Sequence, residues 1–233
     1  SKDANLEVLN LAVPGYGLDQ MLIAYRLIGS PFKADYVLIG VFPEGFWRCT
    51  RAFADSGHAK PYFSLSREGK LELHNNPVPR PFELKTNQFP EILPSGPVRK
   101  ILQKSLLYRA AQRGLIRLGK NLRLIDPDQT PEWILGKAIL RELLQEIRKD
   151  GAQPVLLVLP PERWVRDQRK TSLHKSLLRF MKEEKVLGID MTPPFYEAVK
   201  TEGLASYYFD KEWHWTPKGQ ELAAMLIREY LMS

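Results

Sequence analysis

The chain has 233 residues, of which 44 % are hydrophobic and 26 % charged, and this composition and length suit one globular domain with a sizeable core. No apolar run approaches the roughly 18 residues that cross a bilayer, and Cys49, the one cysteine, excludes an internal disulfide and a cysteine-based metal cluster. The net charge of +7 comes from 34 basic and 27 acidic residues.

The first predicted elements form a strand, a helix and a second strand. An apolar run over residues 6–13 predicts a buried strand that ends in the tight turn Pro14-Gly15-Tyr16-Gly17. Helical spacing predicts a helix over residues 18–28, and residues 35–42 predict another buried strand. A βαβ unit of this length predicts an α/β fold whose mostly parallel sheet has helices on both faces.

Residues 50–97 have a different pattern, with frequent prolines and few apolar residues. Within them, residues 62–66 and 70–74 flank the tripeptide Arg67-Glu68-Gly69, which predicts a β-hairpin. We interpret this region as an insert on the rim of a single domain spanning residues 1–233. Long inserted loops often shape a substrate site.

Residues 99–123 predict a basic amphipathic helix. Apolar residues alternate with eight basic ones and no acid: Arg99, Lys100, Lys104, Arg109, Arg113, Arg117, Lys120 and Arg123. Its basic face is either simply solvated or in peripheral contact with an anionic membrane. No nucleic-acid-binding motif is found, so we expect no nucleic-acid partner.

The second half of the chain continues the alternation of helices and strands. Helices are predicted over residues 131–149, 161–184 and 193–201, and strands over residues 155–159 and 186–191. Thr130 caps the first of these helices. A final helix begins after Trp215, with Thr216 as its cap and Pro217 in its first turn.

The segment of residues 210–219 carries the strongest chemical signal. His214 follows Asp210 by four residues and Glu212 by two, and it lies between Trp213 and Trp215. A histidine beside a carboxylate is a common general base, because the carboxylate fixes its tautomer and stabilises its charged form. A packed histidine at a helix entrance is the structural alternative. No histidine pair has zinc-site spacing, so we expect no metal and no cofactor.

Other candidates lie where predicted strands end. Gly15 and Gly45 have backbone N–H groups that could stabilise an oxyanion. Glu44 and Arg48, together with Trp213 and Trp215, are candidates for binding substrate. An ordinary turn glycine and a surface salt bridge are the structural alternatives for the Gly15 and the Glu44–Arg48 segments.

In this order, residues 10–20, the strand ending at Phe42 and His214-Trp215-Thr216-Pro217-Lys218-Gly219 resemble the SGNH (GDSL-type) esterases and acyltransferases. The resemblance implies a three-layer α/β/α sandwich of flavodoxin-like type and acyl transfer through a serine nucleophile without a metal. It implies that Gly15 is an oxyanion donor, His214 the general base and Glu212, or else Asp210, its acidic partner.

Two family features are missing from this sequence. Glu44-Gly45 stands where the family has an asparagine, and no Gly-Asp-Ser motif ends a strand; Asp55-Ser56-Gly57 follows no predicted strand. We therefore expect the domain to be incomplete at its N-terminus, with the serine upstream of Ser1. Targeting information would also lie upstream, so we expect a soluble protein whose compartment is unknown.

Three functions are consistent with this sequence. The first is an enzyme that hydrolyses or transfers the acyl group of a carbohydrate ester or a small ester. The second is a catalytically inactive SGNH-like binding module, which explains both missing features with one cause. The third is a membrane-surface or scaffold protein that uses residues 99–123.

Overall fold

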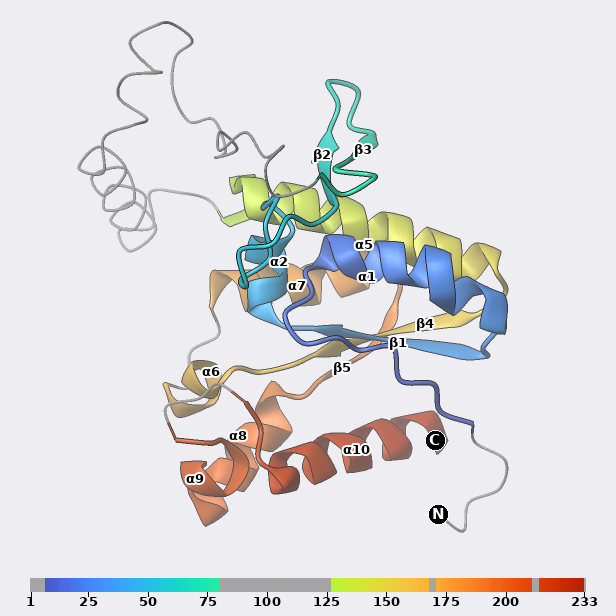
Figure 1. Cartoon of the computed structure of the whole chain (residues 1–233). Helices are drawn as coiled ribbons and strands as arrows, with labels where there is room; N and C mark the ends of the chain where they lie inside the picture. Colours follow the sequence, from blue (N-terminus) through green and yellow to red (C-terminus); the bar gives the residue numbers. More distant parts are fainter. Residues whose placement is uncertain (1–6, 80–126, 168–170, 211–213, 233) are drawn as a thin grey trace, which may run out of the picture.

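The computed structural model describes residues 7–79, 127–167, 171–210 and 214–232. Its centre is a parallel sheet of three strands in the order β1-β4-β5, formed by β1 (Tyr36–Val41), β4 (Gln153–Val158) and β5 (Leu187–Asp190). Leu38 aligns with Val155, and Val155 aligns with Leu187. The mixed α/β class and the parallel sheet predicted from the sequence are thereby confirmed (Figure 1).

One face of the sheet packs against α1 (Leu18–Ala24), α2 (Pro43–Arg48), α5 (Pro131–Lys149) and α7 (Ser172–Glu183). The π-helical turn η1 (Tyr25–Gly29) and the 3₁₀ turn η2 (Ser30–Phe32) continue α1, and the 3₁₀ turn η4 (Pro127–Gln129) precedes α5. As predicted, Thr130 caps α5 by accepting a hydrogen bond from the Trp133 N–H at 3.3 Å. The α5 residues buried in this core are Trp133, Ile139, Leu140, Leu143, Leu144 and Ile147.

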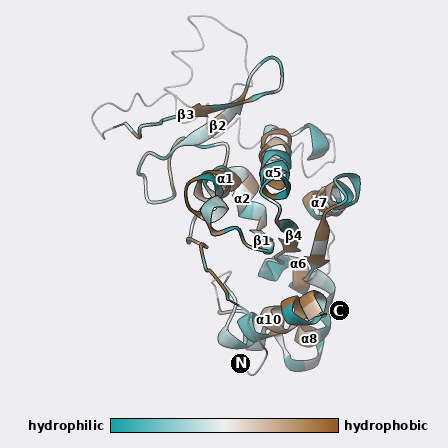
Figure 2. Cartoon of the chain, turned by 90° about the vertical axis from the view of Figure 1, so that its right-hand side faces the viewer, coloured by the Kyte–Doolittle hydropathy of each residue, from teal (hydrophilic) through white to brown (hydrophobic). Residues whose placement is uncertain are grey.

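The opposite face packs against α8 (Thr192–Glu202), α9 (Leu204–Tyr207) and α10 (Pro217–Met232). Figure 2 shows α1, α5 and α7 on one side of the strands and α8 and α10 on the other. Thr216 caps α10, as predicted, since its hydroxyl accepts from the Gly219 N–H at 3.2 Å. Strand residues alternate between the two cores: Leu156 and Val158 join the first, and Val155 and Leu157 the second.

The predicted hairpin is confirmed by the antiparallel strands β2 (Tyr62–Leu65) and β3 (Leu71–His74). It lies over α1 and α5, outside the central sheet (Figure 1). The rest of the predicted insert, residues 80–97, and the predicted basic helix over residues 99–123 lie outside the described residues. No helix in the described ranges is long and apolar enough to cross a membrane.

The predicted strand over residues 6–13 is wrong for its described part. Residues 7–13 form no strand, and Val8 and Leu9 are 82 % and 45 % exposed. An apolar run becomes a buried strand only where a neighbouring strand accepts its hydrogen bonds and a helical layer covers it. Within the described residues, no strand pairs with residues 7–13, so β1 lies at the edge of the described sheet instead of being fully buried.

The predicted helix over residues 161–184 is also wrong as one element. The structure has a short helix α6 (Glu162–Arg166) and then α7, which begins at Ser172. Thr171 is the N-cap of α7, and its hydroxyl accepts from the His174 N–H at 3.2 Å. Helix α6 already ends at Arg166, and the extended backbone of Thr171 starts α7 as a separate helix, because an N-cap residue does not have helical backbone angles.

Candidate functional site

The candidate site lies at the carboxyl end of the parallel sheet, where α2 follows β1 and α6 follows β4. An ion pair joins these two helices: Arg163 donates to Glu44 Oε1 at 3.3 Å. Glu44 Oε2 is buried and has no hydrogen-bond partner among the residues that the structure describes. A buried carboxylate oxygen without a partner is uncommon in a folded core and is more frequent at functional sites.

His214 lies at the same end of the sheet, since residues near it in the chain bind Pro160, which lies two residues after the end of β4. The Tyr208 hydroxyl donates to the Pro160 carbonyl oxygen at 3.0 Å, and the Trp215 indole Nε1 donates to it at 3.4 Å. The Phe209 N–H donates to the His214 carbonyl at 3.1 Å. These bonds position the His214 backbone while its side chain remains exposed.

An aromatic cluster around Phe195 packs against the residues on either side of His214 in the chain. Phe195 of α8 stacks on Trp215 with ring centroids 4.6 Å apart and contacts Tyr207 and Tyr208 edge-on at 6.3 and 6.0 Å. Phe195 and Tyr208 are fully buried. Tyr207, Tyr208 and Trp215 therefore pack on an apolar base, which fixes the residue directly after His214.

We expect Tyr208→Phe to lower the free energy of unfolding by about 1 kcal/mol, because a buried hydroxyl loses its hydrogen bond to Pro160. Burial raises the pKa of Tyr208, so the hydroxyl stays protonated and able to donate. Urea unfolding of the wild type and the variant measures the difference. If both proteins had the same urea midpoint and the same dependence of stability on urea concentration, the hydrogen bond between Tyr208 and Pro160 would not stabilise the fold.

The turn containing Gly15 packs against α2. The Tyr16 N–H donates to the Val13 carbonyl at 3.3 Å, and Gly15 has a φ of 82°, which glycine adopts without strain. At Gly17, a Cβ would lie 2.9 Å from the Cys49 nitrogen. Gly17, the last residue of the predicted turn, is therefore needed for close packing against the end of α2, whereas Gly15 is exposed at the rim.

The other candidates have different surroundings. Gly45 is buried and its N–H donates to the Phe42 carbonyl at 2.9 Å, so this N–H is not directed toward a ligand. Arg48 donates to Asp55 Oδ2 at 3.0 Å, and this ion pair is the structural alternative considered for it. Asp210 is exposed before His214, and Trp215 is partly buried. Glu212 and Trp213 lie outside the described residues.

Sequence reasoning missed a buried histidine–carboxylate pair at the end of β5. His174 Nε2 lies 3.0 Å from Asp190 Oδ2, and the His174 ring stacks on Trp164 at 4.8 Å. Burial favours the neutral form of Asp190, but hydrogen bonds from His174 and Thr192 outweigh it, so the pKa of Asp190 is lowered. No sequence spacing relates residues 174 and 190; only packing of α7 on β5 brings them together.

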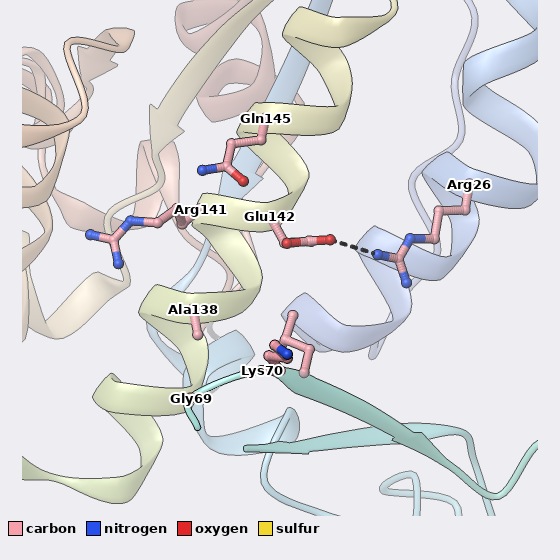
Figure 3. Close-up of a pocket in the computed structure, with 8 residues that line it drawn as sticks. Arg26, Gly69, Lys70, Ala138, Arg141, Glu142 and Gln145 are labelled. Atoms are coloured by element: carbon pink, nitrogen blue, oxygen red, sulfur yellow. Dashed lines mark hydrogen bonds and ion pairs between the residues drawn. The ribbon is translucent and has the colours of Figure 1, made fainter. Parts of the chain in front are cut away.

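The described part of the chain contains no group of three histidine, cysteine or acidic side chains that could hold a metal ion. A shallow cavity of about 350 Å³ lies elsewhere, between the hairpin loop and α5 (Figure 3). Its cations are already paired: Arg26 with Glu142 at 3.2 Å, Arg141 with Glu184 at 2.6 Å and Lys70 with Glu68 at 3.0 Å. This cavity therefore has no strong preference for an anion.

A comparison with protein-family models, with curated proteins and with solved structures finds no match.

Proposed function

We propose that residues 1–233 are part of an SGNH-type ester hydrolase or O-acyltransferase with an α/β/α sandwich fold. The observation that carries this proposal is the location of His214. Hydrogen bonds from Tyr208 and Trp215 to Pro160 hold its segment at the carboxyl end of a parallel sheet, where ligands of such sheets bind. The substrate class we infer is a carbohydrate ester or a small acyl ester.

In the proposed reaction, a serine from outside residues 1–233 attacks the ester carbonyl through its Oγ. His214 takes the hydroxyl proton and passes it to the leaving alcohol, which departs as the acyl–serine ester forms. Water or an acceptor hydroxyl then attacks this ester and gives its proton to His214, which returns the proton to the serine Oγ as the acid or the new ester is released. Glu212 or Asp210 orients His214, and the Gly15 N–H stabilises the oxyanion.

Among the described residues, no strand pairs with the outer edge of β1, and we propose that the serine-bearing strand pairs there. The carbonyls of Asp35 and Val41 accept from β4-side amides at 2.8 and 3.0 Å, so the odd-numbered residues face β4. Tyr36, Leu38 and Gly40 consequently point their N–H and C=O groups outward. Tyr36 and Leu38 are 50 % and 40 % exposed, which favours a further apolar strand here. A parallel strand would end beside α2 and the Gly15 turn.

Hydrogen exchange tests this pairing. In the full-length protein we expect the amides of Tyr36, Leu38 and Gly40 to be protected to a degree near that of the β4 amides, because a strand partner accepts their hydrogen bonds. In residues 1–233 alone, the same amides should exchange faster. Equally fast exchange of these three amides in both proteins would contradict the proposed strand pairing. The β4 amides serve as the internal reference.

A non-catalytic binding module is the second candidate, and one observation favours it. Glu44 offers only acceptor atoms when ionised, and the Gly45 N–H is already bonded to Phe42, so the second oxyanion donor is missing. Hydrolysis of p-nitrophenyl acetate by the full-length protein separates the two. Turnover above the buffer rate, saturable by substrate, supports the enzyme; carbohydrate binding without turnover supports the binding module.

A further inference from the structure

A buried ion pair connects α1 to the loop before the hairpin. Lys60 Nζ donates to Asp19 Oδ2, although 41 residues separate the two in sequence. The side chain of Asp19 is fully buried and that of Lys60 is 4 % exposed. Burial raises the pKa of Asp19, and the charge of Lys60 opposes that rise. Nothing in the proposed reaction uses either group directly.

The carboxylate of Asp19 also lies against the glycine turn. Its Oδ1 accepts from the Gln20 N–H at 2.9 Å, and a Cβ at Gly17 would lie only 2.6 Å from it. The carboxylate is thus fixed by a cation on one side and by the start of α1 on the other. Any displacement of Asp19 would displace the turn that presents Gly15.

Lys60 is equally well fixed. The backbone N–H of Lys60 donates to the Ala52 carbonyl at 2.9 Å, and its backbone carbonyl accepts from Asn75 Nδ2 at 3.0 Å. Lys60 therefore links the loop after α2, the end of strand β3 and the start of α1. The backbone of Lys60 bonds two of these segments and its side chain bonds the third, so one residue joins all three.

Stability alone is a poor reason for such a pair. Removing two charges from water is costly, and apolar side chains of similar volume often serve as well or better. A charged hydrogen bond, however, is directional, whereas apolar contacts are not. The geometry therefore fits a role in orientation better than a role in stability.

We propose that Asp19 and Lys60 are positioning residues that fix the Gly15–Gly17 turn relative to the loop over residues 52–61. The catalytic consequence rests on the proposed function: the pair sets where the Gly15 N–H meets the oxyanion. The loop over residues 52–61 and the Gly15–Gly17 turn then form one mechanical unit.

Three variants of the full-length protein test this role: Asp19→Leu, Lys60→Met and the double variant. Each single variant leaves one buried charge unpaired, so its Tm should fall. The double variant leaves no charge and similar volume, so its Tm should return close to the wild-type value. Its kcat should nevertheless stay about 10²-fold low, because a turn misplaced by about 1 Å costs that much, while KM stays within about twofold.

Hydrogen exchange gives a readout that is independent of activity. Amides of residues 15–21 should exchange about tenfold faster in the double variant, since a hydrogen bond between charged groups is lost. Recovery of Tm, kcat and slow exchange together would overturn the positioning role. If the wild type shows no esterase activity, the proposed function fails and the exchange result still decides this inference.

Asn75→Ala provides a milder variant in case the others do not fold. It removes the hydrogen bond to the Lys60 carbonyl without leaving a buried charge. Exchange of residues 15–21 should rise about fivefold, in line with one lost hydrogen bond. If the amides of residues 15–21 exchanged at the wild-type rate both in Asn75→Ala and in the double variant, the link between Lys60 and the turn would be contradicted.

Discussion

Replacing His214 by alanine in the full-length protein will lower kcat for a p-nitrophenyl ester by at least about 10³-fold, while KM changes little. The reason is that the serine hydroxyl is a weak nucleophile unless a base removes its proton as it attacks. Because His214 is exposed and its backbone is held by Phe209, the substitution should not unfold the protein. Circular dichroism of the variant checks that its fold is intact.

His58→Ala is the matched control for this experiment. His58 is exposed in the loop before the hairpin, where its ring contacts Ser56, and it has no place in the proposed reaction. Its kcat should equal that of the wild type. Full activity of His214→Ala would remove the histidine from the mechanism, and equal losses in both variants would point to a nonspecific effect.

The orienting acid follows from a side-by-side comparison of Glu212→Gln and Asp210→Asn. The acid that orients His214 should lower kcat by about 10²–10⁴-fold when neutralised, because an amide stabilises the imidazolium poorly and favours the wrong tautomer. The other acid should change kcat little. Identical small effects would contradict a carboxylate partner for His214.

Phe195→Ala will lower the free energy of unfolding by about 3–5 kcal/mol, the second large effect we expect. Phe195 is fully buried and its ring contacts three aromatic rings, so truncation removes apolar burial and opens a cavity under the His214 segment. Urea unfolding measures the loss. Without the Phe195 ring, Trp215 loses its packing partner and its contact with Pro160 should loosen. We therefore expect the protein that remains folded to have lower esterase activity as well.

Phe32→Ala is the control of the same chemistry at the surface. Phe32 is 53 % exposed in the turn after α1, so its truncation should cost less than about 1 kcal/mol. A cost for Phe195→Ala as small as that for Phe32→Ala would mean that the aromatic cluster does not support the site.

Elements with a complete local signal could be predicted from the sequence. Helix α5 has a threonine cap, a proline in its first turn and a regular apolar stripe, and the structure has it at the predicted residues. The hairpin needed only a glycine-containing loop between two short runs. The run over residues 6–13 has an equally good strand signal, but a strand requires a partner that local sequence cannot supply.

The candidate site could be predicted only in part, for the same reason. The spacing of Asp210 and His214 and the helix start at Pro217 are local features. The contact of Trp215 with Pro160 joins residues 55 positions apart, and that of Lys60 with Asp19 joins residues 41 apart. Neither pair has a sequence signature, because side chains meet there through the packing of whole elements.

Sequence alone was enough to predict helices α5, α8 and α10, the hairpin and the parallel α/β class, because these depend on periodicity, capping and turn residues within short windows. Tertiary structure alone decided which strand lies at the edge, which carbonyl anchors the His214 segment and which buried charges are paired. Those features depend on burial and on partners far away in the chain, and their free energy arises only when separate elements pack together.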